Sequence, residues 1–98
     1  MNFEWDPGKE KINREIHGIS FSTAKFVFND PERWERYDSN HSEGEDRWQT
    51  IGLVHKVLFV VYSEQGETIR MISARMADEC ERKVYNGKRN IESWTKAN

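Results

Sequence analysis

A run of seven residues, Val57 to Ser63 (VLFVVYS), constrains the fold of this chain more than any other feature. Its β-branched and aromatic side chains favour a strand, and a strand this apolar throughout is typically buried on both faces. Gln65-Gly66 follows and predicts a hairpin turn into a second strand over Thr68 to Ala74. Another strand, over Arg47 to Leu53, comes just before, so Val57 to Ser63 is predicted to be central in a sheet.

The same run bears on where the protein works. It is far shorter than the roughly 20 residues that a membrane-spanning helix needs. The start, Met1 to Glu4, has neither a basic segment nor a long apolar run, so no signal peptide is expected. A chain with the single cysteine Cys80 cannot form an internal disulfide. We therefore expect a cytoplasmic protein that does not associate with membranes.

Two helices are predicted in the N-terminal third. Asp6-Pro7 combines an N-cap residue with proline at the first helical position. Gly18 is a stop signal, so the first helix runs to about Ile16, with Ile12 and Ile16 facing the core. Ser20 can cap a second, short helix. Its apolar residues recur at helical spacing: Phe21, Ala24, Val27 and Phe28.

The remaining segments add two strands, a loop and a last helix. Short strands are predicted over Phe3 to Trp5 and Arg33 to Tyr37, and the polar stretch Asp38 to Glu45 is a loop. From about Ala77 to Asn86-Gly87 the pattern is helical. The residues expected to face inward there are Met76, Cys80 and Val84.

This order of elements is typical of the α+β class. Short turns between successive strands predict an antiparallel sheet, with the helices on one side. Ninety-eight residues support one core, so residues 1–90 are predicted to form a single domain and 91–98 a C-terminal extension. Ile91 and Trp94 are the only large apolar residues of that extension, which is expected to form a helical turn or to be loose.

The net charge of −2 does not favour a nucleic-acid-binding protein, because such domains are usually basic. The charges are unevenly distributed, however. Acidic residues concentrate in 43–46 and 79–81, and basic residues in 9–14 and 70–89. A local basic patch is therefore compatible with the acidic total.

Lys9, Asn13 and His17 are spaced four residues apart and share one face of the first predicted helix. A cation, an amide and an imidazole together could contact a phosphate backbone or a base edge. The same residues could equally form a solvated face, with His17 at the helix C-terminus, where positive charge is favoured.

Arg70 and Arg75 could clamp a phosphate and stabilise charge that develops during its cleavage. Ion pairs with Glu64, Glu67 or Glu81 are the alternative. Residues five apart on a regular strand point to opposite faces. Both arginines can therefore serve one site only if the strand ends or bulges near residues 73–74.

Glu81 and Tyr85 are four residues apart on the last predicted helix and face the same way. A carboxylate could act as a general base, and a phenol could donate a proton or stack on a base. An ordinary helix surface with a partly buried tyrosine would show the same spacing.

The sequence favours neither a metal nor another cofactor. The histidines are scattered, and no Cys or His pair has the spacing of a zinc site. Residues 38–44 look like the start of a calcium loop, but Glu43 stands where such a loop needs glycine. The twelfth position, which should be acidic, is Gln49.

Three blocks of residues resemble the BrnT toxins of bacterial type II toxin–antitoxin systems. The first is Phe3 to Asp6 with Lys9, Asn13 and His17 to Phe21; the second is Asp38 to Arg47 with Ile51-Gly52; the third is Arg70 to Arg75 with Glu81-Arg82 and Tyr85. The blocks differ from the usual pattern at Ile16, where relatives often have lysine, and in the acidic last helix.

The resemblance implies a RelE-like fold with two N-terminal helices and one C-terminal helix. It implies a toxin that cleaves RNA and halts translation. It also implies a partner, a BrnA-like antitoxin with a ribbon-helix-helix part, in a two-plus-two assembly. Operator DNA would be contacted only through this antitoxin.

The resemblance also suggests roles. Arg70 and Arg75 would stabilise the transition state, His17 or Glu81 would be the base, and Tyr85 would stack or donate a proton. The residues expected to bind substrate are Lys9, Asn13, Arg47 and Arg82.

The leading hypothesis is thus a metal-independent endoribonuclease that forms a cyclic phosphate. The alternative is a homologue that binds its antitoxin or RNA without cutting. Four aromatic residues could anchor the antitoxin or belong to the core: Trp34, Tyr37, Trp48 and Trp94.

Overall fold

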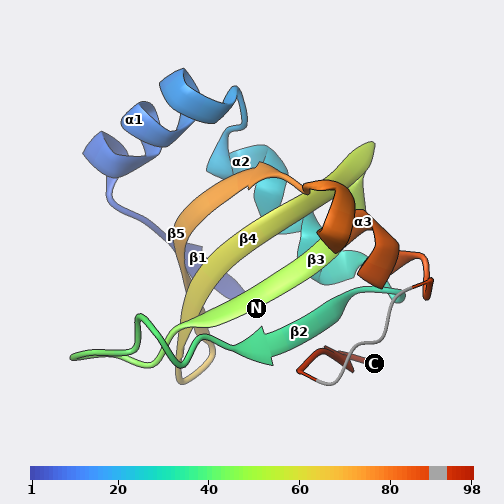
Figure 1. The fold of residues 1–98 in the computed structure, drawn as a ribbon. Helices are drawn as coiled ribbons and strands as arrows, with labels where there is room; N and C mark the ends of the chain where they lie inside the picture. The colour runs from blue at the N-terminus through green and yellow to red at the C-terminus, as the bar shows by residue number, and fades with distance from the viewer. Residues whose placement is uncertain (89–92) are drawn as a thin grey trace.

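The structure, a computed structural model, describes residues 1–88 and 93–98 (Figure 1). Its elements are β1 (Asn2–Glu4), α1 (Pro7–His17), α2 (Phe21–Ala24), the 3₁₀ helix η1 (Lys25–Asn29), β2 (Trp34–Tyr37), β3 (Trp48–Val54), β4 (Lys56–Gln65), β5 (Thr68–Met76), α3 (Glu79–Tyr85) and β6 (Thr95–Lys96). Within the described ranges, six strands form one sheet in the order β1-β5-β4-β3-β2-β6. The α+β class is confirmed, and β4, which contains the VLFVVYS run, has strands on both sides.

The sheet is mixed, whereas the sequence predicted an antiparallel one. Strands β2 to β5 pair antiparallel with their neighbours, but β1 pairs parallel with β5. The chain leaves β1 through α1 and α2 and re-enters the sheet in β2, on the other side of β3, β4 and β5. No tight turn therefore links β1 to a sheet neighbour, and its direction is not fixed to be antiparallel.

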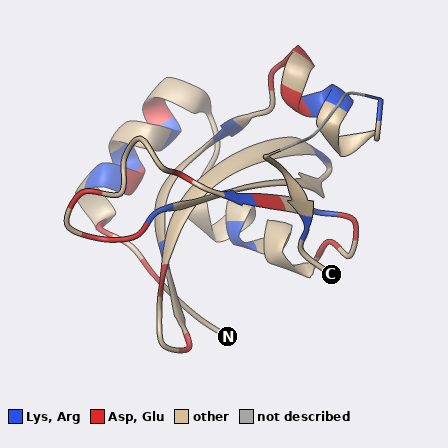
Figure 2. Ribbon diagram, turned by 60° about the horizontal axis from the view of Figure 1, so that its bottom comes forward, with Lys and Arg blue, Asp and Glu red and all other residues tan. Residues whose placement is uncertain are grey.

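Charged residues are spread over the whole fold (Figure 2). Basic and acidic residues alternate along α1, and α3 has its acidic residues in the first turn and its basic residues in the last; among the charged residues of the segment 38–47 between β2 and β3, most are acidic. No helix among the described residues is long and apolar enough to cross a membrane.

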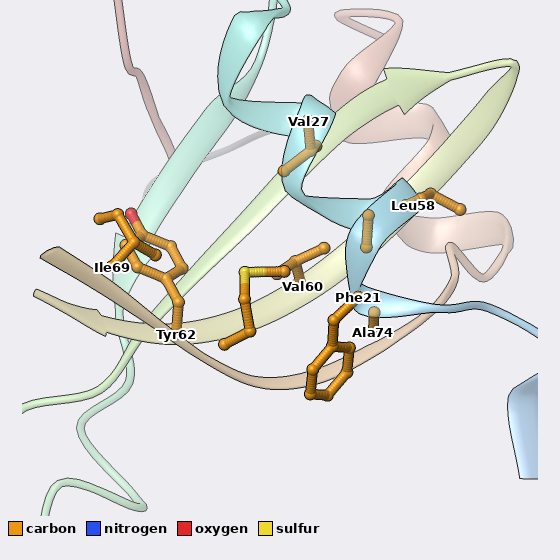
Figure 3. Packing of buried hydrophobic residues seen from close by; sticks show 9 residues of the cluster. Phe21, Val27, Leu58, Val60, Tyr62, Ile69 and Ala74 are labelled. Atoms are coloured by element: carbon orange, nitrogen blue, oxygen red, sulfur yellow. The ribbon is translucent and has the colours of Figure 1, made fainter. Parts of the chain in front are cut away.

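Side chains of β4 alternate between two cores on opposite faces of the sheet. The first core includes residues of α2, η1, β4 and β5 (Figure 3): Phe21, Ala24, Val27, Leu58, Val60, Tyr62, Ile69, Met71 and Ala74. Phe59, between Leu58 and Val60, points to the second core, where it clusters with Ile51 and with Val84 of α3. The expectation that all helices lie on one side of the sheet is therefore wrong, since α3 packs opposite α2.

The ends of α1 are where the sequence predicts them. The Asp6 side chain accepts hydrogen bonds from the backbone N–H groups of Gly8 and Lys9, and Gly18 closes the helix at φ 72°. The inward face is different from the one expected. Ile12 and Ile16 are 57% and 68% exposed.

The inward face of α1 is polar because the helix lies against the backbone of β5. Strand β1 pairs only with residues 68–70 of β5, so the following edge needs other hydrogen-bond partners. The buried Asn13 provides them. Its Nδ2 donates to the Ala74 carbonyl at 2.8 Å, and its Oδ1 accepts from the Ala74 N–H at 3.2 Å. An isoleucine at this position would leave both backbone groups unpaired.

Helix α3 begins with a capping box formed by Asp78 and Glu81. Val84 is buried as expected, but Met76 and Cys80 are exposed, so their inward assignment is wrong. The helix is short and is buried against the sheet through Val84, near its C-terminal end. Met76 and Cys80 lie just before and within its first turn, away from that contact.

The described part of the C-terminal extension packs on the sheet. Trp94 is buried against Phe59, and β6 pairs with β2. These residues therefore form neither the helical turn nor the loose segment expected from sequence. Ile91 lies outside the described residues.

Candidate functional site

A β-bulge in β5 decides how the two candidate arginines are oriented. Ser73 pairs with Val61 of β4 and Met71 pairs with Tyr62, so Ile72 is an extra residue between two successive pairs. An extra residue shifts the alternation of side chains by one position. Arg70 and Arg75 therefore point to the same face of the sheet, the face on which α3 packs. From the sequence, both arginines could serve one site only if the strand was irregular near residues 73–74. The bulge at Ile72 lies one residue before that position.

Arg70 is at the centre of a polar cluster on this face. Its Nε donates to Glu4 Oε1 and its Nη1 to Glu45 Oε2, both at 3.2 Å, and Nη2 donates to Gln65 Oε1 at 3.4 Å. Ser63 Oγ also donates to Glu45 Oε2, at 3.3 Å. We call these five residues the Arg70 cluster. These three acceptors differ from the ion-pair partners proposed from sequence, which were Glu64, Glu67 and Glu81.

A pocket of about 330 Å³ opens beside the Arg70 cluster. It is lined by Glu4, Trp5, Asp6, Lys9, Glu45, Arg47, Arg70, Met71 and Ile72. Three residues proposed from sequence to contact RNA, namely Lys9, Arg47 and Arg70, thus border one space. Arg47 Nε is buried and has no hydrogen-bond partner in the part of the chain that the structure describes. The pocket combines three cations and an aromatic ring with three carboxylates, so it could hold a phosphate and a base where the cations are not paired within the protein.

Arg75 is engaged in a different way. Its Nη1 and Nη2 donate to Glu81 Oε1 and Oε2, each at 2.8 Å, and its guanidinium lies 4.1 Å from the centre of the Phe59 ring. The hydrogen bonds to Glu81 raise the pKa of Arg75. Glu81 Oε1 also accepts from the Asp78 N–H in the capping box. We call Arg75, Glu81, Asp78 and Phe59 the Arg75 cluster. Both carboxylate oxygens of Glu81 accept hydrogen bonds within this cluster.

Tyr85 faces the end of η1. Its hydroxyl donates to Asp30 Oδ2 at 2.6 Å. Partial burial, followed by the hydrogen bond and the negative charge of Asp30, raises the pKa of Tyr85. Burial tends to raise the pKa of Asp30 too. The hydrogen bonds from Tyr85 and from the N–H groups of Glu32 and Leu53 outweigh it, so this pKa is lowered. This pair joins α3 to η1 and β3.

The other residues proposed from sequence are placed elsewhere. Asn13 is bonded to the β5 backbone, as described above, and Arg82 donates to the Ala77 carbonyl at 2.7 Å. His17 borders two further pockets, one beside Ile12 and Ile16 and one beside the β3–β4 turn. The structure thus gathers Lys9, Arg47 and Arg70 in one place, pairs Arg75 with Glu81, and puts His17 in neither cluster.

Residues 5–81 match the sequence model of a family described as the ribonuclease toxin BrnT of type II toxin–antitoxin systems. The chain belongs to the BrnT family. The match includes most of the pocket and all of the Arg75 cluster, and it ends before Tyr85. As type II systems pair a toxin with a protein antitoxin, BrnT membership implies such a partner. No curated protein sequence matches the chain.

Sequence reasoning about BrnT-like residues missed four members of the Arg70 cluster: Glu4, Glu45, Ser63 and Gln65. Two of them could have been found, because Ser63 and Gln65 are two residues apart on β4 and therefore point to the same face of the sheet. Glu4 and Glu45 reach Arg70 through the pairing of β1 with β5 and through the path of a loop. Neither is encoded by local spacing.

No set of three or more His, Cys, Asp or Glu residues is arranged to hold a metal ion within the described ranges. The groups that could neutralise a phosphate here are the cations of the pocket. Arginine suits this chemistry because its planar fork matches phosphate oxygens and it stays charged at all physiological pH values.

Proposed function

We propose that this member of the BrnT family is a metal-independent endoribonuclease that cuts RNA beside Arg70 and thereby inhibits translation. The RNA 2′-hydroxyl attacks the adjacent phosphorus and forms a new O2′–P bond. The P–O5′ bond breaks and the leaving oxygen takes a proton from water, which leaves a 2′,3′-cyclic phosphate and a 5′-hydroxyl. The observation that best supports this proposal is the pocket in which Lys9, Arg47 and Arg70 meet, in a family described as ribonuclease toxins.

Arg70 is proposed to stabilise the extra negative charge on the phosphorane, while Lys9 and Arg47 position neighbouring phosphates. Such charge stabilisation in a preorganised site is commonly the largest contribution to catalysis. Arg75, the other arginine proposed for this role from sequence, is already bound at both Nη atoms by Glu81. We therefore assign Arg75 a positioning role, in which it attaches α3 to β5.

The base is proposed to be Glu4 rather than Glu81 or His17. A general base must reach the 2′-hydroxyl within hydrogen-bond distance. Glu4 is half exposed and borders the same pocket as Arg70. Arg75 binds both carboxylate oxygens of Glu81, whereas Arg70 binds Glu4 through Oε1, and His17 borders other pockets. Glu4→Gln is expected to slow cleavage of RNA, because an amide cannot accept the proton of the 2′-hydroxyl.

The decisive experiment incubates the purified chain with total RNA in EDTA and analyses the new RNA ends. Cleavage with cyclic-phosphate ends is expected, and the Arg70→Ala variant should leave the RNA intact. If the folded chain leaves RNA intact and does not arrest growth on expression, the non-catalytic binding module becomes the better explanation. The net charge of −2 and the two carboxylates on Arg70 favour that second candidate.

The antitoxin is proposed to be a BrnA-like ribbon-helix-helix protein that masks the toxin in a two-plus-two complex and binds operator DNA itself. We propose that both partners are cytoplasmic. Co-expression with the neighbouring reading frame should yield a complex with the mass of two copies of each chain. A complex with another stoichiometry, or no complex, would contradict this part of the proposal.

A further inference from the structure

One oxygen of Glu45 accepts an unusual number of hydrogen bonds. Ser63 Oγ, Gln65 Nε2 and Arg70 Nη1 all donate to Glu45 Oε2, at 3.3, 3.2 and 3.2 Å. Three donors that converge on one anionic oxygen form an anion-binding cradle. In this structure the anion that fills the cradle belongs to the protein itself.

The donors and the acceptor differ in how firmly they are held. Ser63 and Gln65 are on β4, and Arg70 is on the neighbouring strand β5. Ser63 is 1% exposed, so its position is fixed by packing. Glu45 lies instead in the segment between β2 and β3, outside any helix or strand. The strand positions of the three donors, and the Ser63 hydroxyl itself, would therefore remain in place if the Glu45 carboxylate left the cradle.

Glu45 lies in the loop of residues 38–47, which we call the Glu45 loop. The contacts at the base of this loop, where it joins β2 and β3, do not depend on the cradle. Asp38 is buried, and its Oδ1 accepts from the Asn40 N–H and contacts His41 Nδ1. Ser42 Oγ donates to the Asp38 carbonyl and accepts from the Arg47 N–H. These contacts hold both ends of the loop, so the part around Glu45 can move without unfolding its base.

We propose that Ser63, Gln65 and Arg70 form a phosphate-binding subsite that the Glu45 carboxylate fills in the free protein and that an RNA phosphate takes over on binding. The inference rests on the proposed function, because it names where that substrate would place a phosphate. Carboxylate and phosphodiester oxygens are both anionic acceptors that suit a guanidinium. Lys9 and Arg47 border the same pocket and would add attraction for a polyanion.

Glu45 is then a competitor attached to the protein. When its charge is removed, a phosphate has to displace only neutral-acceptor hydrogen bonds, and no longer an ion pair with Arg70. We expect Glu45→Gln to tighten phosphate-chain binding by roughly tenfold, given the usual strength of such contacts. Glu43→Gln is the matched control, since it removes the same charge from an exposed position two residues away in the same loop.

The test titrates a fluorescently labelled single-stranded DNA oligonucleotide, which lacks the 2′-hydroxyl and cannot be cleaved by the proposed reaction. The expected result is tighter binding for Glu45→Gln, a change below about twofold for Glu43→Gln, and no gain for Glu45→Gln combined with Arg70→Ala. Equal effects of the two glutamate variants, or a gain that survives Arg70→Ala, would overturn the proposal.

A second measurement uses the unmutated chain and so does not depend on folded variants. Titration with inorganic phosphate should shift the NMR signals of the Gln65 side-chain amide in a saturable way, and those of the Gln49 amide much less. No saturable shift at Gln65 would count against the subsite. Failure of the ribonuclease proposal is separate: RNA would stay intact while the Glu45→Gln effect on DNA binding persisted.

Discussion

Arg70 and Arg75 are on the same strand and the same face, yet their surroundings differ. Arg75 forms a two-pronged ion pair with Glu81, whose side chain is only 12% exposed. Arg70 makes single contacts with Glu4, Glu45 and Gln65, and the side chains of these two glutamates are 47% and 30% exposed. The Arg75 cluster resembles a structural joint, and the Arg70 cluster resembles a site whose contacts can be exchanged.

The difference comes from the elements that supply the carboxylates. Glu81 is on the first turn of α3, where the capping box holds its side chain independently of Arg75. Glu45 comes from a loop, and Glu4 from the last residue of a three-residue edge strand. A guanidinium is thus available to a ligand when its acceptors are loosely held, even on a rigid strand.

The largest expected effect that separates the two clusters is on catalysis. Arg70→Ala should lower the cleavage rate by roughly 10²–10³-fold, as the loss of one charge-stabilising donor does in other enzymes. Its effect on stability should be below about 1 kcal/mol, because exposed ion pairs contribute little. Single-turnover cleavage of a short RNA and urea unfolding measure the two quantities.

Arg75→Ala provides the matched comparison for this experiment. If it lowers the cleavage rate per folded molecule more than Arg70→Ala does, the assignment of the two arginines is reversed. Arg70→Lys, which keeps the charge but loses the planar fork, should fall between the wild type and Arg70→Ala.

Stability should show the opposite order. Arg75→Ala should lower the free energy of unfolding by about 1–3 kcal/mol, because it removes two charged hydrogen bonds and a contact with the Phe59 ring. A double-mutant cycle with Glu81→Gln measures how much of this loss belongs to the pair. A coupling energy near zero would show that the two residues do not act as a joint.

Tyr85 lies on α3, which covers the other end of the same sheet face, so a Tyr85 variant tests whether that end is structural. Tyr85→Phe removes the 2.6 Å hydrogen bond to Asp30 and should lower the free energy of unfolding by about 1 kcal/mol, with little change in cleavage per folded molecule. A large loss of cleavage in a fully folded variant would instead support the role as proton donor that the sequence suggested.

This hydrogen bond should also be visible in the pH dependence of stability. The pKa of Tyr85 is raised in the folded state, so its contribution is complete below the ordinary tyrosine pKa of about 10 and is lost at higher pH. The pKa of Asp30 is lowered, so its contribution is lost as pH falls below about 4. Chemical unfolding across the pH range should show smaller losses at both extremes for Tyr85→Phe.

The sequence predicted most elements because their signals are local. Proline, glycine and capping residues give the ends of α1, and the VLFVVYS run identifies β4. The direction of β1 and the side on which α3 packs are set by contacts between distant segments. Asn13 shows the same limit. Its spacing from Lys9 and His17 suggested a binding face, but the unpaired edge of β5 makes it a partner for backbone groups.

The candidate site was predictable in part. Arg70, Lys9 and Arg47 were named from sequence and meet at one pocket, and the need for a break in β5 followed from the five-residue spacing. What spacing could not supply is which carboxylate each arginine meets. Glu81 was one candidate and binds Arg75, whereas Arg70 is bound by Glu4 and Glu45, which come from outside the β4–β5 hairpin.

The smallest effect concerns Lys9, an exposed cation at the edge of the pocket near Arg70. If it contacts one phosphate, Lys9→Met should weaken binding of a DNA oligonucleotide a few-fold and reduce the slope of log affinity against log salt by about 0.7. Lys83→Met is the control, because Lys83 is also exposed but lies on α3 and pairs with Glu79. Equal slopes for the two variants would mean that polyanions are attracted by net charge alone. A difference between them would place the bound chain at the Arg70 end of the sheet face.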